Sequence, residues 1–445
     1  MLSAHLPEAA YLSRMRDGTV KQVNPFTGSQ IWTVPGRGNR PLGVVSPDPK
    51  PITAEDHTKH CAFCSDRYLE TPPEKGRMVR DENGWRTLLR LPAEELFDTI
   101  AEFRRVPNLF AILSYDYWHE NYGYELPPHI EERRQNYLAS EAGLAHVLKV
   151  CEQKARAGGM TPEAWAALDR ESQLAGSWGF FGSTHDVVIG RRHFVDGATR
   201  DNQLASSGTL TPEEHFRYTE FTVEAMRTLY SMNRYARYVA VFQNWLKPAG
   251  ASFDHLHKQL AAIDERGVQT ELELSRVRAN PNLFNEGAVN YASYQNLVIA
   301  ENDYAVAFAG FGHRYPTLEI YSKARTPEPW LHTEAEMRAM SDLIHACQAA
   351  TGPDVPSNEE WHHKAPDVDV PMPWRVMLKW RVSTLAGFEG GTKIYLNTID
   401  PWTLRDRVVL ELFRLRAEGR IADNLRIATE CECRPNCLRY NPQLR

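Results

Sequence analysis

Two histidines and a glutamine alternate with other residues in the segment His255-Leu-His257-Lys-Gln259. In an extended chain, side chains two residues apart project to the same face, so the sequence predicts a row of two imidazoles and one amide, with Leu256 on the opposite face. A neutral imidazole can attack phosphorus and form a covalent intermediate. The other imidazole can bind a metal ion, and an amide can donate to a phosphate oxygen. The competing interpretation is a pair of surface histidines on an edge strand.

The cysteines form a second group of residues with a chemical signature. Cys61 and Cys64 have the Cys-x-x-Cys spacing of half a tetrahedral zinc site, and a redox pair is the alternative, although no thioredoxin-like sequence surrounds them. Seven cysteines are an odd number in a long chain, which favours reduced, cytoplasmic thiols and metal sites over a disulfide framework. Three thiols near the C-terminus could hold a second zinc or form a reduced tail: Cys431, Cys433 and Cys437.

The elements that must position the histidines can be followed along the first half of the chain. The residues 238–242 predict a strand, which a loop containing Pro248 and Gly250 separates from the histidine row and from the apolar run 260–263. The remaining expectations for this half are an irregular stretch or short helix over 1–20, a strand over 30–34, a helical segment over about 114–180, a short strand over 184–189 and a helix from Thr211 to Tyr230.

The second half repeats this order in outline. A turn near residue 267 precedes a helical linker over 271–278, so we place a domain boundary at 267. Thr333 and Glu336 form a capping-box pattern at the start of a helix that runs to Ala350. The predicted strands of this half cover 304–310, 317–322, 376–382 and 393–396.

The bulk composition excludes several classes of protein. The 445 residues are 42% hydrophobic and 24% charged, which is typical of a globular protein with two or three domains. A net charge of −6 predicts no nucleic-acid partner. The sequence shows no signal-peptide core and no apolar run of about 18 residues, so we expect no membrane association and a cytoplasmic location.

The active-site motifs resemble those of a known family. Phe242-Gln-Asn244, Ala249-Gly-Ala-Ser252 and the histidine row together are similar to the active-site segment of galactose-1-phosphate uridylyltransferases, in the histidine-triad superfamily. The resemblance implies that His257 accepts a nucleotidyl group, His255 binds zinc and Gln259 contacts the phosphate. Gln259 also favours transfer over hydrolysis, because the hydrolase branch has histidine there. One departure is Leu256, where the family has proline.

Further segments of the first half resemble the same family. Arg37 and Arg40 match a basic loop near the substrate phosphates, and guanidinium groups suit phosphate. Asn108 matches a Pro-Asn segment that lines the nucleobase pocket. For the fourth zinc ligand we choose His193, which closes a segment similar to the family's His-Glu-Val-Ile-x-x-x-x-x-His, over His119. His185 is then expected to be structural, with a donor to the substrate phosphate as the alternative. Ser252 is expected to act in catalysis with Gln259, and Asn244 to bind substrate.

In the second half, Ala386-Gly-Phe-Glu389-Gly-Gly-Thr392 resembles a family segment that reaches into the sugar site of a partner subunit. The resemblance therefore implies a homodimer in which Glu389 and Thr392 contact substrate. The histidines that bind a second metal in some members are absent around Trp374–Arg381, so no second metal is expected there. Lys379 or Arg381 is instead expected to face an anionic ligand.

Taken together, these observations predict an α+β protein. It has an N-terminal domain over 1–267 of histidine-triad type with a helical insertion, a degenerate second domain of that type over 268–425, and a cysteine-containing tail over 426–445. The expected function is nucleotidyl transfer between a nucleotide sugar and a sugar phosphate through His257, with a structural zinc held by Cys61, Cys64, His193 and His255. The alternatives are a phosphorylase of dinucleoside polyphosphates or ADP-sugars, and a non-catalytic nucleotide-binding relative.

Overall fold

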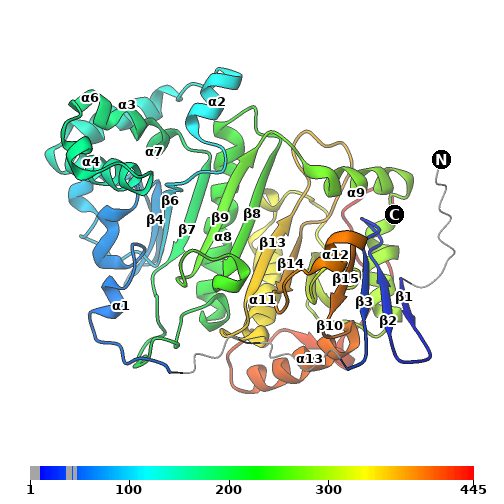
Figure 1. The fold of residues 1–445 in the computed structure, drawn as a ribbon. Helices are drawn as coiled ribbons and strands as arrows, with labels where there is room; N and C mark the ends of the chain where they lie inside the picture. The colour runs from blue at the N-terminus through cyan, green and yellow to red at the C-terminus, as the bar shows by residue number, and fades with distance from the viewer. Residues whose placement is uncertain (1–10, 37–42, 44–47, 445) are drawn as a thin grey trace.

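A twelve-stranded antiparallel sheet forms the centre of the molecule (Figure 1). The structure is a computed structural model that describes residues 11–36, 43 and 48–444, so Arg37 and Arg40 lie outside the described residues. In spatial order the strands are β16 (Arg426–Ile427), β10 (Val298–Glu301), β11 (Ala305–Ala309), β12 (Thr317–Ser322), β14 (Arg375–Trp380), β13 (Ser357–His362), β8 (Tyr238–Trp245), β9 (His257–Ile263), β7 (His185–Gly190), β6 (Phe103–Pro107), β4 (Gly76–Asp81) and β5 (Gly84–Leu89).

The two halves of the chain meet inside this sheet. The central strands β8 and β13 are paired, with Val241 opposite Trp361, and each half continues outward on its own side. The strands next to this central pair occupy equivalent positions in the two halves: β9 lies between β8 and β7, and β14 lies between β13 and β12. The helix α9 (Gly267–Ala279) begins at the residue where we placed the domain boundary, and that boundary stays a prediction.

A smaller sheet brings the N-terminal region against the second half of the chain. It consists of β1 (Leu12–Arg14), β2 (Val20–Val23), β3 (Gln30–Thr33) and β15 (Ile394–Asn397), with β15 parallel to β3. Residues 12–14 and 20–23 therefore form a pair of strands joined by a turn, and the expectation of an irregular stretch or short helix is wrong for the first of these strands. A strand of three residues carries too little alternation to be recognised, and cross-strand pairing with β2 decides its conformation.

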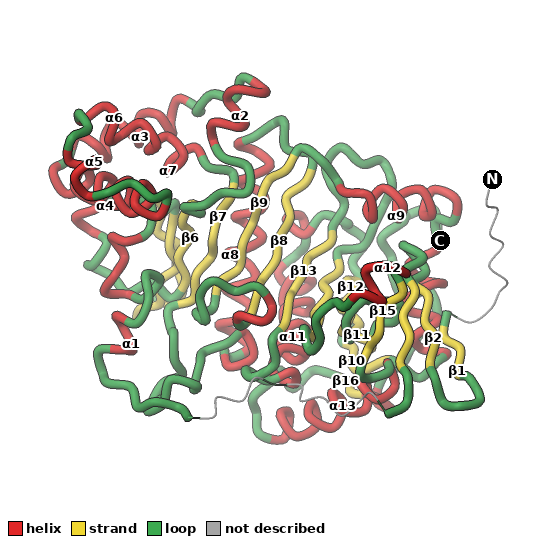
Figure 2. Tube along the Cα trace, in the orientation of Figure 1, coloured by secondary structure: helices red, strands yellow, loops and turns green. Residues whose placement is uncertain are grey.

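Helices cover one face of the large sheet and its β10–β11 end (Figure 2). The helix α8 (Pro212–Met232) packs on β7, β8 and β9, and α11 (Glu334–Thr351) on β11, β12 and β14. Both begin with a capping box, in which a threonine hydroxyl and a glutamate three residues later satisfy each other's backbone N–H groups. The sequence predicts the box at Thr333 as such, and at Thr211 it predicts the start of the helix. The helix α13 (Pro401–Ala417) contacts β10, β11 and α11.

The helical insertion packs beyond the β4–β7 end of the sheet, where Figure 1 shows it as a separate group of helices. It contains α2 (Tyr115–Tyr122), α3 (Pro128–Ala139), α4 (Glu141–Ala157), α5 (Pro162–Ala166), α6 (Arg170–Leu174) and α7 (Trp178–Gly182). A separate hydrophobic cluster, which includes Val147, Val150 and Phe181, holds α3 to α7 together, whereas Trp118 of α2 packs in the main core. The predicted helical segment over 114–180 is confirmed.

The remaining helices are short: α1 (Asp56–Lys59), α10 (Tyr291–Tyr294) and α12 (Gly387–Thr392). The C-terminal tail adds β16 to the edge of the sheet beside β10. The predicted α+β class is confirmed. Among the described residues, no helix combines the length and the apolar character needed to span a bilayer.

Candidate active site and metal centre

The histidine row lies at the start of β9, which begins at His257, so His255 precedes the strand. His257 and Gln259 line one cavity, as the two-residue period requires, while His255 is turned toward the cysteines. Leu256 causes the turn: its side chain is buried against Gly190, and its carbonyl accepts a hydrogen bond from the Gly190 N–H at 2.9 Å. The predicted row of three side chains is therefore wrong for one of them. His257 and Gln259 share a face, and His255 points toward the cysteines as a candidate metal ligand.

Four side chains from distant parts of the sequence converge on one point. The six distances between the Sγ atoms of Cys61 and Cys64 and the Nδ1 atoms of His193 and His255 run from 3.2 to 3.8 Å. A tetrahedral zinc ion with ordinary bond lengths would give edges of about 3.8 Å between sulfurs, ~3.6 Å between sulfur and nitrogen and ~3.3 Å between nitrogens. The four residues chosen from the sequence could therefore hold one zinc ion.

The surroundings prepare the histidines of this cluster as ligands. The Nε2–H of His255 donates to the carbonyl of Gly190 at 2.7 Å, which leaves the Nδ1 lone pair directed at the cysteines. Burial lowers the pKa of His193, so its imidazole is neutral. With four protein ligands the ion would have no open position, as in structural zinc sites.

A cavity of about 300 Å³ opens beside this cluster. Aromatic and aliphatic side chains form much of its wall, together with several polar groups and the carboxylate of Glu70. Among the described residues, no lysine or arginine lines it. The side chains that line it together with His257 include Phe63, Val106, Asn108, Phe110, His185, Ser252, Phe253 and Gln259. A cavity of this size, with apolar walls and polar groups between them, suits a flat, partly apolar ligand such as a nucleobase with its ribose.

His257 presents one bare ring nitrogen to this cavity. The side chain is 5% exposed, and its Nδ1–H donates to the carbonyl of His255 at 2.7 Å. Burial lowers the pKa of His257 to about 4, so the ring is neutral at pH 7 and carries its single proton on Nδ1. The lone pair of Nε2 is therefore free, and the Phe63 ring packs against the imidazole with 5.3 Å between ring centres.

A small network fixes the orientation of Gln259. The N–H of Ile112 donates to Nδ1 of His185 at 3.0 Å, so the proton of this neutral ring is on Nε2. This Nε2–H and the Nδ2–H of Asn108 both donate to Oε1 of Gln259, at 3.2 and 3.1 Å. Because the amide oxygen is held by two donors, the NH₂ end of Gln259 is left for the cavity.

The other predicted site residues lie at three separate places in the fold. Ser252 lines the mouth of the cavity and is exposed. Asn244 lies on the neighbouring strand β8, where its Oδ1 accepts from Nδ2 of Asn358 at 2.7 Å. Glu389 and Thr392 belong to α12; Glu389 caps this helix at the Ala386 N–H, and neither residue lines the His257 cavity.

The three C-terminal cysteines do not gather as the first cluster does. Among the described residues, the cluster of Cys61 is the one group of metal-binding side chains that converges. Cys431 instead places its Sγ 3.2 Å from the carbonyl of Arg426. A second zinc at Cys431, Cys433 and Cys437 therefore stays a prediction.

Sequence reasoning missed three aromatic side chains that shape the cavity. Phe63 lies inside the Cys-x-x-Cys knuckle, Phe110 two residues after Asn108, and Phe253 next to Ser252. Phe63 and Phe253 have ring centres 4.6 Å apart, and Phe110 and Phe253 are 62% and 38% exposed. Their positions next to motif residues were a usable signal, since exposed aromatic residues beside a polar motif indicate a binding surface.

Comparisons with known proteins agree with this architecture. A family model described as "Domain of unknown function (DUF4921)" matches residues 15–440. The crystal structure of an ADP-glucose phosphorylase from Arabidopsis thaliana with bound ADP-glucose is similar, with a TM-score of 0.56 and 18% identity over 88% of this chain and 98% of that chain. A GalT-like protein from Arabidopsis thaliana gives a TM-score of 0.54 and 18% identity over 87% and 98%. No curated protein matches the sequence. The predicted resemblance to the galactose-1-phosphate uridylyltransferase-like family is confirmed for the fold.

Proposed function

Because the chain belongs to the DUF4921 family, whose description names no activity, we propose a function from the site itself: transfer of a nucleotidyl group through His257. The observation that carries this proposal is the bare Nε2 of a buried, neutral His257 facing the 300 Å³ cavity beside the amide of Gln259. The donor substrate would be a nucleotide sugar and the acceptor a sugar phosphate.

The first step makes one bond and breaks one. The Nε2 lone pair of His257 attacks the α-phosphorus, the bond from this phosphorus to the bridging oxygen breaks, and the sugar phosphate leaves with that electron pair. The ring then carries a positive charge, which the hydrogen bond from its Nδ1–H to the His255 carbonyl stabilises. In the second step a phosphate oxygen of the acceptor attacks, the P–N bond breaks and neutral His257 returns.

The residues around His257 would bind and orient the substrate. The NH₂ group of Gln259 donates to a phosphate oxygen without supplying a proton to the reaction, and Ser252 lies at the mouth as a second donor. Phe63, Phe110 and Phe253 would enclose the nucleobase. Arg37 and Arg40, outside the described residues, remain the predicted source of positive charge for the phosphates.

The metal centre would have a structural role. Zinc at Cys61, Cys64, His193 and His255 would tie the Cys-x-x-Cys knuckle to the start of β9 and so fix the carbonyl of His255 that holds His257. The site would also extend to a second copy of the chain. Phe388 of α12 is 43% accessible and Thr392 is exposed, which supports a contact of this segment with a partner's sugar site. Glu389 is buried and caps its own helix, so the helix would have to rearrange before Glu389 could reach a substrate.

Inorganic phosphate is the alternative acceptor. The neighbour described as an ADP-glucose phosphorylase, which has this fold, supports testing it alongside sugar phosphates. The donor assays therefore include both UDP-glucose and ADP-glucose.

The test is to trap the covalent intermediate. Protein incubated with UDP-glucose or ADP-glucose labelled at the α-phosphate should retain acid-labile, base-stable label, and His257→Asn should retain none. His129→Asn, an exposed histidine in the insertion, serves as the matched control and should label like the wild type. Release of the label by galactose 1-phosphate or by phosphate then identifies the acceptor. Equal labelling of the His257→Asn variant, or no labelling of the wild type by either donor, would refute the proposal.

A further inference from the structure

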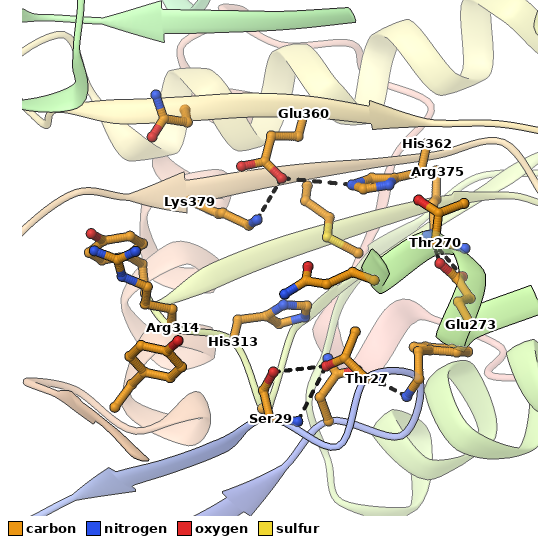
Figure 3. Close-up of a pocket in the computed structure, with 18 of the residues that line it drawn as sticks. Thr27, Ser29, Thr270, Glu273, His313, Arg314, Glu360, His362, Arg375 and Lys379 are labelled. Atoms are coloured by element: carbon orange, nitrogen blue, oxygen red, sulfur yellow. Dashed lines mark hydrogen bonds and ion pairs between the residues drawn. The ribbon is translucent and has the colours of Figure 1, made fainter. Parts of the chain in front are cut away.

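A second cavity, of about 400 Å³, lies beside strands β13 and β14 (Figure 3). It is on the same face of the large sheet as the His257 cavity. The strand register establishes the shared face, because Phe242 is paired with both Gln259 and Glu360, and Glu360 with Met377. The strands β9 and β14 are three strand spacings apart, roughly 14 Å. The second cavity is therefore separate from the first. Most of its lining comes from the second half of the chain, and the turn between β2 and β3 supplies the opposite wall.

Four positively charged side chains and two carboxylates line this cavity. Arg375 is paired with Glu273 and Lys379 with Glu360, each at 2.5 Å, so these four charges cancel. Arg314 and Arg381 also line the cavity, and neither forms an ion pair with any described residue. The described lining thus carries two positive charges in excess, whereas the chain as a whole is negative.

The same cavity concentrates unused hydrogen-bonding groups. Among the described residues, the Nε atoms of Arg314, Arg375 and Arg381 and Nη1 of Arg375 are buried without a partner. A buried polar group without a partner costs about 1–3 kcal/mol, more when it is charged. Arg375 is only 2% exposed, so bulk water does not satisfy it. These buried nitrogen atoms avoid that free-energy cost only if a ligand or ordered water in the cavity accepts their hydrogen bonds.

The two unpaired arginines are held in place. The Tyr315 ring stacks with both guanidinium groups, whose carbons lie 4.9 Å (Arg314) and 4.7 Å (Arg381) from the ring centre. The two carbons are therefore at most about 10 Å apart. Oδ1 of Asn358 accepts from Nη1 of Arg381 at 2.6 Å, which fixes the second guanidinium. Two guanidinium groups on one wall of the cavity, with no carboxylate paired to either among the described residues, favour a bound anion.

The opposite wall supplies neutral polar groups. Thr27 and Ser29, on the turn between β2 and β3, point into the cavity across from Lys379 and Glu360 (Figure 3). Their hydroxyls are 2.9 Å apart and can accept or donate to hydroxyl groups of a ligand. The cavity thus combines a cationic end with a hydroxyl-binding end.

We propose that this second cavity binds a small phosphate monoester, with the phosphate between Arg314 and Arg381 and the ligand's hydroxyls near Thr27 and Ser29. The sequence predicted that Lys379 or Arg381 faces an anion. Lys379 is already neutralised by Glu360, so Arg381 takes this role, together with Arg314. The site is independent of the proposed transfer through His257.

Met377 provides a local reporter for the test, because it lines the second cavity and no methionine lines the first. The full-length protein is labelled with [methyl-¹³C]methionine, and the Met377 signal is assigned with Met377→Leu. Glycerol 3-phosphate is then titrated in, with inorganic phosphate and glycerol as parallel arms. We expect a saturable shift of the Met377 signal with glycerol 3-phosphate, a weaker response to phosphate and none to glycerol, while the signal of Met226, a buried residue of α8, stays unmoved.

Variants connect the response to the two arginines. The double variant Arg314→Gln/Arg381→Gln should bind glycerol 3-phosphate at least about tenfold more weakly, since each arginine supplies charge-assisted hydrogen bonds. Arg325→Gln, an exposed arginine of the same half, should bind like the wild type. His257→Asn should abolish covalent labelling and leave the Met377 response intact, which separates this proposal from the proposed function. A Met377 signal that glycerol 3-phosphate leaves unmoved, or moves equally in the double variant, would overturn the inference.

Discussion

The orientation of Gln259 by Asn108 and His185 can be tested with a single-atom exchange. In Asn108→Asp, one carboxylate oxygen still accepts the hydrogen bond from the Phe110 N–H (2.9 Å in the wild type), so the local turn is preserved. The NH₂ group that donates to Oε1 of Gln259 at 3.1 Å is replaced by a negative oxygen. Two facing acceptors repel, so we expect the Gln259 amide to rotate and to present its oxygen, instead of its NH₂, to the cavity.

The size of the effect follows from what the substrate loses. A hydrogen bond between a neutral donor and a charged phosphate oxygen contributes about 1.5–3 kcal/mol, equivalent to a factor of ~10 to ~150. The rate of nucleotidyl-protein formation under single-turnover conditions should fall by this factor. Asn121→Asp makes the same chemical change on the exposed face of α2 and should leave the rate unchanged. Rapid-quench labelling with the better of the two donors measures both.

The decisive result is the coupling between the two positions. If Asn108 acts only by orienting Gln259, then Asn108→Asp should have no further effect in a Gln259→Ala background. Independent effects, whose free energies simply add, would refute the reasoning. So would an Asn108→Asp protein that is correctly folded and labels at the wild-type rate.

The remaining predictions concern the metal, a buried ion pair and acid stability. Metal analysis should find one zinc ion per chain. Cys64→Ser should lose this ion and unfold at a temperature several degrees lower, whereas Cys437→Ser should keep it; two zinc ions per chain would instead support the C-terminal site. In urea unfolding, Lys258→Met should lower the unfolding free energy by about 3–5 kcal/mol, because it removes the ammonium group 2.8 Å from the buried carboxylate of Glu359. The double variant Lys258→Met/Glu359→Gln should recover part of this loss. Burial lowers the pKa of His345 to about 4, so only the unfolded chain binds this proton between pH 6.5 and 4. The unfolding free energy should therefore fall as the pH drops below 6.5, by about 1.4 kcal/mol per pH unit from this residue, and His345→Gln should reduce the slope; a stability that rises over this range would contradict the assignment.

The parts of the site that the sequence predicted are those that depend on local spacing. His257 and Gln259 share a face because the strand period is two, and the Cys61–Cys64 knuckle brings two thiols together by its own turn. The choice of His193 depended on a resemblance, because no local rule connects residue 61 with residue 193. The four-ligand convergence is a result of tertiary folding.

Other features could not be read from local patterns. His255 leaves the predicted row because Leu256 packs on Gly190, a contact across 66 residues of sequence. The pairing of β15 with β3 joins residues 394–397 to residues 30–33, and no periodicity indicates such a partner. The second cavity consists of loops and strands from both ends of the chain, so its excess charge becomes visible only after folding.

The pairing of β8 with β13 has a consequence for how the molecule opens. Residues 357–361 of one half are hydrogen-bonded along residues 241–245 of the other, so the halves share a ladder instead of a flexible joint. Amide protons along this ladder should exchange with solvent only when the whole sheet comes apart, and hardly through local fluctuation. A protease that cuts the exposed chain near residue 265 should accordingly leave two fragments that elute as one particle and separate only in denaturant.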